Sequence, residues 1–205
     1  MDRLPTQSRI VNAALARLGS TRRVSAIEDD ADAEAVWSDL VRLLLASHPW
    51  NFAIVTRQLN PADAVAYTGS RWRLAFTMPR DCLRWLPPGN DAGRDHFTAA
   101  QEGDLLLTDA SAPVIRYVSS AAAGEVSRWP PHFVEAVTLA LAERLAEPVT
   151  QSASVARDMA EAADYALRRA KRADGLQSNG SGRTREAQVH SSWLAARGTR
   201  YVPGR

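Results

Sequence analysis

The first fifty residues carry apolar positions at the spacing of two amphipathic helices. The first helix is predicted over residues 5–18, where apolar residues recur at intervals of three and four and Gly19 follows as a cap. The second is predicted to start at the acidic residues 29–32, whose charge suits a helix N-terminus, and to stop before Pro49. Because the link between them is short, we expect the two helices to pack as antiparallel neighbours.

Two further helices are predicted in the second half of the chain. One follows the prolines Pro130 and Pro131, carries an apolar stripe and is ended by Pro148. The other is capped within residues 150–154, has a narrow face of small residues suited to close packing, and ends before Gly175. We expect the four helices to form a bundle, because each pair must cover the apolar stripes of the other.

The helical spacing is lost between these two pairs of helices. Short strand-like segments separated by turn-forming residues are predicted at residues 72–76, 82–86, 105–108 and 114–118. Prolines, glycines, asparagine and aspartates at residues 87–95 predict a protruding loop. The predicted fold class is therefore mainly α (α+β), a four-helix bundle with an inserted small antiparallel β region and an extended C-terminal arm.

This pattern divides the chain into three parts. Residues 1–50 and 126–174 are predicted to form a discontinuous helical bundle, and residues 51–125 a β insert with the protruding loop. Residues 175–205, which are rich in glycine and polar residues, are predicted to form a flexible C-terminal arm.

Charge separates the arm from the rest. The 205 residues carry a net charge of +2, but from Arg168 onward nine basic residues against two acidic ones give +7, which leaves −5 for the preceding part. Such a basic arm predicts contact with nucleic acid or with an acidic protein surface, the alternative being a solvated tail. Trp193, Leu194 and Tyr201 are anchors that order on a neighbouring subunit or, alternatively, fold back onto the same chain.

The sequence shows no pattern typical of catalysis. A single cysteine, Cys82, excludes an internal disulfide, and the four histidines stand in separate regions without the spacing of metal ligands. Acidic pairs such as Glu102 with Asp104 are read as turn formers rather than as a general acid and base. We therefore expect no enzyme, no cofactor and no metal, and, since no apolar run approaches membrane length, a soluble, unsecreted protein.

Four short motifs, taken in their order along the chain, resemble a known family. They are PWNFA at residues 49–53, MPRDCLR at 78–84, IRY at 115–117 and WPPHF at 129–133. Together they are similar to the tail tubular protein A family of bacteriophages, head-to-tail adaptor proteins that sit beneath the portal. The resemblance covers about residues 4–173.

The resemblance implies a non-enzymatic structural protein of the virion, made in the host cytoplasm. Its partners would be the portal protein, a tail nozzle or next tail component, and neighbouring copies in a ring of about twelve. DNA would pass through the lumen without sequence readout. The residues expected to dock on the portal are Arg183, Arg185, Trp193, Leu194, Arg197, Arg200 and Tyr201.

Large aromatic side chains are expected to fix the helical part against the β insert. Trp50, Phe52 and Trp129 are predicted to provide this hinge packing, since each buries a large surface where the two parts meet. Arg80, Asp81 and Arg84 are expected either to form an ion-pair network or to lie on a solvated face. The alternative function is a nucleic-acid-binding protein that uses its basic C-terminal arm.

Overall fold

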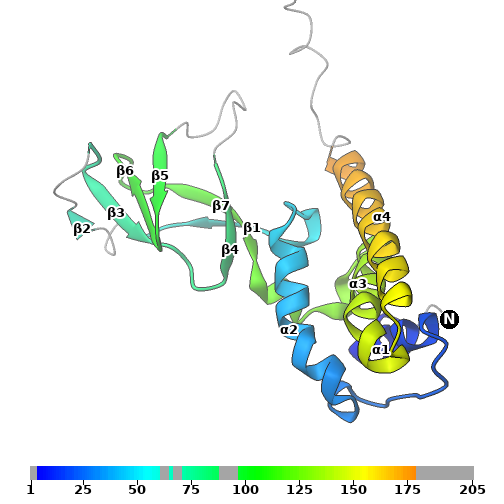
Figure 1. Ribbon diagram of the computed structural model, residues 1–205. Coiled ribbons are helices and arrows are strands. Elements are labelled where there is room, and N and C mark those ends of the chain that lie inside the picture. Colours follow the sequence, from blue (N-terminus) through cyan, green and yellow to red (C-terminus); the bar gives the residue numbers. More distant parts are fainter. Residues whose placement is uncertain (1–3, 61–64, 67–70, 88–96, 179–205) are drawn as a thin grey trace, which may run out of the picture.

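A computed structural model describes residues 4–60, 65–66, 71–87 and 97–178. The helices gather on one side of the molecule and the strands on the other (Figure 1). In the described part of the chain, no helix combines the length and the apolar character needed to cross a bilayer.

The first two helices begin and end where local chemistry dictates. Helix α1 spans Gln7–Arg17, and the side chain of its N-cap residue, Thr6, accepts a hydrogen bond from the backbone N–H of Arg9. Its C-terminal turn is closed by Gly19, which has a φ of +75°, while Ser20 N–H donates to the carbonyl of Leu15 at 3.0 Å. This is the Schellman arrangement that the predicted glycine cap requires.

Helix α2 spans Ala31–Ala46 and follows a short 3₁₀ helix, Ile27–Asp29. Its N-cap is Asp30, a buried residue whose carboxylate accepts from the backbone N–H of Ala33 at 3.1 Å. The acidic start predicted for this helix is thus a true cap.

Helix α3, Pro131–Thr150, is the central element of the helical part. Its buried residues lie around most of its circumference rather than on one stripe: Phe133, Ala136, Val137, Thr138, Leu139, Ala140, Leu141, Ala142, Leu145 and Ala146. A helix that is apolar nearly all round must be covered on several sides, and α1, α2 and α4 each pack against it. The expected antiparallel α1–α2 pair is therefore wrong, because both helices pack chiefly on α3.

Both C-terminal helices run further than the sequence predicts. Pro148 does not end α3, because a proline in the last turn costs only one backbone hydrogen bond, and the helix ends at Gln151 in the left-handed region with a φ of +53°. Helix α4 spans Ala153–Ser178 and so includes Gly175. It packs on α3 through the predicted small-residue face, where Ala163, Ala166 and Ala170 are buried.

The strands form two antiparallel sheets. Strands β1 (Ile54–Gln58), β7 (Val114–Ser119) and β4 (Cys82–Leu86) make a three-stranded sheet in the order β1-β7-β4. Strands β2 (Val65–Ala66), β3 (Leu74–Thr77), β6 (Leu105–Thr108) and β5 (Ala99–Glu102) make a four-stranded sheet in the order β2-β3-β6-β5.

The predicted four-helix bundle with a small β insert is wrong. The chain is an α+β protein with four α-helices and two antiparallel sheets, and its strands fill a layer of their own beside the helices (Figure 1). The predicted strands at 82–86 and 105–108 match β4 and β6, whereas β1, β2 and β5 were not expected. Most of the predicted loop at 87–95 lies outside the described residues.

Two main apolar cores follow from this division. The larger core joins the four helices and extends to Val118 at the end of β7. The smaller core lies between the strands and centres on Phe76, Leu106 and Tyr117. The chain crosses from helices to strands at residues 47–54 and returns at residues 119–133; we call these two crossings together the junction.

Candidate functional site at the junction of helices and sheets

Aromatic side chains from both crossings meet at the junction. Phe133, at the start of α3, lies 4.8 Å from Trp50, 4.9 Å from Phe52 and 5.0 Å from Trp129, measured between ring centroids. Trp129 in turn stacks on Trp37 of α2 at 6.1 Å. The structure therefore brings together all three residues for which the sequence predicts hinge packing, and adds Phe133 as the ring that touches each of them.

The two buried indoles of this cluster also have hydrogen-bond partners. Trp50 is fully buried, and its Nε1–H donates to the carbonyl of Leu44 at 2.8 Å. Trp129 is almost fully buried, and its Nε1–H donates to the carbonyl of Ala122 at 2.8 Å. Each ring is thus fixed in orientation as well as in position, because a buried indole N–H is costly to leave unpaired.

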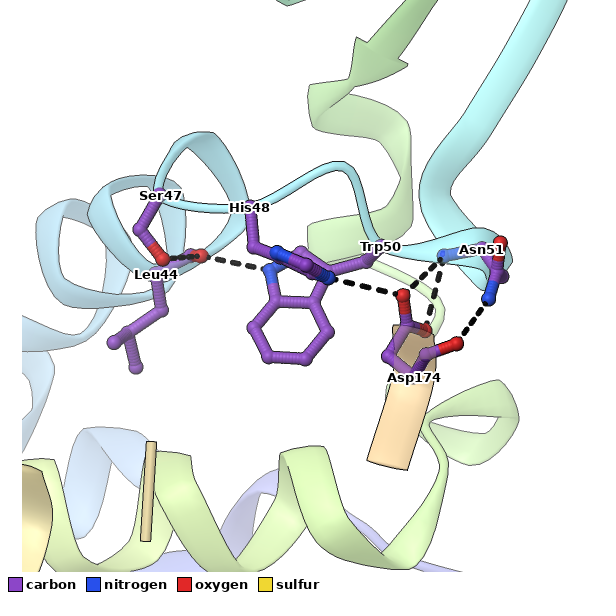
Figure 2. A network of polar contacts seen from close by, with 6 residues as sticks. All are labelled: Leu44, Ser47, His48, Trp50, Asn51 and Asp174. Atoms are coloured by element: carbon purple, nitrogen blue, oxygen red, sulfur yellow. Dashed lines mark hydrogen bonds and ion pairs between the residues drawn. The ribbon is translucent and has the colours of Figure 1, made fainter. Parts of the chain in front are cut away.

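A buried carboxylate near the end of α4 fixes that helix to the first crossing (Figure 2). Asp174 is 1% exposed and accepts from the backbone N–H of Asn51 at 3.1 and 3.3 Å. The Asn51 side chain returns a bond from Nδ2 to the backbone carbonyl of Asp174 at 2.8 Å. The end of α4 and the start of the β part are therefore tied by reciprocal hydrogen bonds.

His48 completes this network. Its Nε2 lies 3.2 Å from Asp174 Oδ2, and its ring packs edge-on against Trp50 at 4.8 Å (Figure 2). Burial lowers the pKa of His48 below its ordinary value, and this outweighs the opposing effect of the Asp174 charge. At neutral pH His48 is therefore uncharged and donates Nε2–H to the carboxylate.

A second carboxylate closes the other side of the junction, where β4 begins. Asp81 accepts from Ser119 Oγ at 2.5 Å and from the hydroxyl of Tyr117 at 3.2 Å, and its backbone carbonyl accepts from Ser120 N–H at 2.7 Å. Burial, together with the charge of Asp81, raises the pKa of the Tyr117 phenol. Asp81 thus bonds hydroxyl groups of β7, and among the described residues no ion pair joins it to Arg80 or Arg84.

A cavity of about 470 Å³ with a mixed polar and apolar lining opens beside Asp81. Arg57 of β1 and Arg80 also line it. Because Asp81 already bonds Tyr117 and Ser119, the lining offers binding contacts rather than a free general base.

Cys82, the one cysteine of the chain, is half-buried. Burial, with the Asp81 charge adding to it, raises the pKa of the Cys82 thiol, which keeps it protonated and a poor nucleophile. In the portion of the chain that the structure describes, no three His, Cys, Asp or Glu side chains are grouped so that they could hold a metal ion.

The residues predicted to dock on the portal lie outside the described residues: Arg183, Arg185, Trp193, Leu194, Arg197, Arg200 and Tyr201. Sequence reasoning missed the network of His48, Asn51 and Asp174. One signal pointed to it: Asp174 falls four residues after Ala170, on the small-residue stripe of α4 that faces the core.

No protein-family model matches this sequence, and a search of the curated proteins finds no match either. The geometry of the junction and the motifs that build it therefore carry the functional argument.

Proposed function

We propose that the protein is a structural subunit of a bacteriophage head-to-tail adaptor. In this proposal, copies form a ring between the portal protein and the tail nozzle or next tail component, at the head-tail junction of the virion. DNA passes through the lumen of the ring and is not read by sequence. The protein has no catalytic role.

The observation that carries the proposal is the convergence of the four motif segments. PWNFA and WPPHF contribute the aromatic cluster, through Trp50, Phe52 and Phe133. MPRDCLR and IRY contribute the bonds between Asp81 and Tyr117. Segments separated by dozens of residues thus build one rigid connection between a helical part and a β part.

A rigid connection suits a protein that holds two partners at a fixed spacing. Buried aromatic rings, paired indole donors and two buried or half-buried carboxylates all restrict the same junction, so the β part cannot pivot freely on the helices. In the proposed ring, the helical part meets neighbouring copies and the β part extends toward the tail.

The fixed end of α4 also fits this role. Asp174 fixes the end of α4 at the junction, and residues 179–205 follow this helix in the sequence. We propose that this segment, with Trp193, Leu194 and Tyr201 as anchors and its arginines as charged contacts, docks on the portal.

Electron microscopy of the protein mixed with the portal protein of the same virus tests the proposal. We expect a ring of copies seated on the portal, and no seating for a chain that ends at Ser178, which keeps every described element. Unfolding of the truncated chain, followed by circular dichroism, controls for loss of the fold. A portal that remains bare with the full-length protein would contradict the adaptor role.

One observation favours the alternative of a nucleic-acid-binding protein. The second half of α4 exposes Arg168, Arg169 and Arg172, which continue the positive charge of residues 179–205 onto a helix surface. This alternative requires duplex DNA binding that weakens steeply with salt and falls in the chain ending at Ser178, which keeps the α4 arginines but loses those of residues 179–205. The adaptor proposal instead requires portal docking at salt concentrations that suppress any such binding.

A further inference from the structure

On the side away from α3, helix α4 presents exposed side chains. Its buried side is formed by Ala163, Ala166 and Ala170. On the opposite side, Tyr165 is 59% exposed to solvent and Leu176 is 65% exposed. Arg169 and Arg172 lie between these two apolar side chains, and the Arg169 guanidinium lies 5.8 Å from the centroid of the Tyr165 ring. Neither arginine has an ion-pair partner among the described residues.

Helix α2 presents a face of opposite charge. Its exposed side carries Asp32 and Asp39, with one basic residue, Arg42, next to them. Leu43 on the same side is 58% exposed. Within the described part of the chain, Asp32 and Asp39 have no ion-pair partner.

The two faces match in spacing when the helices run in the same direction. If Leu43 is placed beside Leu176, then Asp39 stands beside Arg172, because each charge lies four residues before its leucine. Further back, Asp32 stands one turn from Arg169. Leu43 and Asp39 thus meet Leu176 and Arg172 with complementary polarity, while Asp32 lies level with Tyr165.

The orientation of the helices within one subunit permits this pairing between subunits. Helices α2 and α4 run in the same direction, with their C-terminal ends joined by the His48–Asp174 contact (Figure 1). Rotation of one copy about an axis roughly along these helices therefore brings its α2 parallel to α4 of the next copy. Because the two faces differ, each copy keeps one free α2 face and one free α4 face, so the contact propagates into a closed ring or a filament.

We infer that the outward face of α2 binds the outward face of α4 of a second copy, in parallel, with Leu43 against Leu176 and Asp39 against Arg172. The closure of this contact into a ring rests on the proposed function, but the contact itself does not. Exposed ion pairs are individually weak, so the association is weak in dilute protein and falls as salt rises.

Disulfide cross-linking tests the contact and its register. In a Cys82→Ala background, the variant Leu43→Cys with Leu176→Cys is expected to form a ladder of covalent multimers at high protein concentration and low salt. Leu43→Cys alone or Leu176→Cys alone is expected to stop at dimers or monomers. The variant Leu43→Cys with Tyr165→Cys would cross-link if the two helices packed antiparallel. If it formed as many covalent multimers as the Leu43→Cys, Leu176→Cys variant, or more, the inference would be overturned.

Charge reversal gives an independent readout by sedimentation velocity. Asp39→Arg is expected to weaken the association at least tenfold, and Asp39→Arg with Arg172→Asp in one chain to restore most of it. Glu147→Arg, on an exposed position of α3, is the matched control and is expected to leave it unchanged. Wild-type protein that stays monomeric at hundreds of micromolar and low salt, without a ladder, overturns the inference.

Portal docking separates this inference from the proposed function. If the ladder and the charge rescue appear but the portal stays bare, the contact stands and the adaptor role fails. If copies seat on the portal while the ladder is absent and Asp39→Arg has no effect, the adaptor role stands and this contact is wrong.

Discussion

Replacing Asp174 with alanine probes the connection between α4 and the junction. The substitution removes the acceptor of two donors, the backbone N–H of Asn51 and Nε2–H of His48. A partly buried donor that loses its acceptor costs about 1–3 kcal/mol, and this cost falls mainly on the Asn51 N–H, because the His48 ring is 22% exposed and can turn toward water.

Two smaller effects act in the opposite direction. Alanine has a higher helix propensity than aspartate, by about 0.6 kcal/mol, and the loss of a negative charge near a helix C-terminus gains about 0.3–1 kcal/mol. We therefore expect Asp174→Ala to lower the free energy of unfolding by about 1 kcal/mol. Asp174→Asn keeps one carbonyl oxygen for Asn51 and is expected to cost about half as much.

Urea denaturation followed by circular dichroism measures this difference as a shift of the midpoint at unchanged slope. The matched control is Asp158→Ala, which removes an exposed carboxylate from the same helix and is expected to change the free energy of unfolding by less than about 0.5 kcal/mol. If Asp174→Ala and Asp158→Ala gave the same midpoint, the junction would not depend on this carboxylate.

Three further predictions concern the same framework. Trp50→Ala should destabilise the protein by about 3–5 kcal/mol in urea denaturation, whereas the exposed Tyr165→Ala should change stability by less than about 0.5 kcal/mol; equal effects would refute the packing role. Because the pKa of His48 is lower in the folded protein than in the unfolded chain, its contribution to stability is complete above the unfolded pKa of about 6.5 and is lost as the pH falls through the folded pKa. His48→Gln should remove this loss of stability at low pH, measured as the free energy of unfolding against pH. An unchanged dependence on pH would contradict the prediction. Gly19→Ala should cost about 1 kcal/mol because of the φ of +75°, whereas Gly124→Ala, at a negative φ and with a nearest contact of 3.7 Å, should be nearly neutral in thermal unfolding.

The helix boundaries that follow from local chemistry could be predicted from the sequence. Gly19 closes α1 and the acidic start of α2 provides its cap, since both depend only on neighbouring residues. The arrangement of the helices could not be predicted in the same way. One apolar stripe was recognised on α3, but Thr138 and several alanines on its other sides are also buried, and small or polar residues do not mark a buried face by their type.

Strands without alternating burial were missed for a related reason. In β1 every residue after Ile54 is exposed, and β5 begins with two alanines, which have low β propensity. Their pairing partners, β7 and β6, supply the context that makes them strands.

Asp174 shows why the sequence alone does not predict the polar network at the junction. In sequence it lies among the basic residues that follow Arg168, which indicates a solvated position, but its place on the alanine stripe of α4 puts it in the core. The aromatic rings that meet around Phe133 are easier to predict from the sequence, because large side chains such as tryptophan and phenylalanine are usually buried.

The pairing of β1 with β7 has a consequence for how this protein diversifies. Ile54 and Val118 are register partners, so the β part leaves and re-enters the helical part at points about 5 Å apart. Any substitute domain with adjacent termini could be grafted at that site while the helical scaffold keeps its connectivity. Selection could therefore exchange the β part between lineages, and a designer could swap it in the same way.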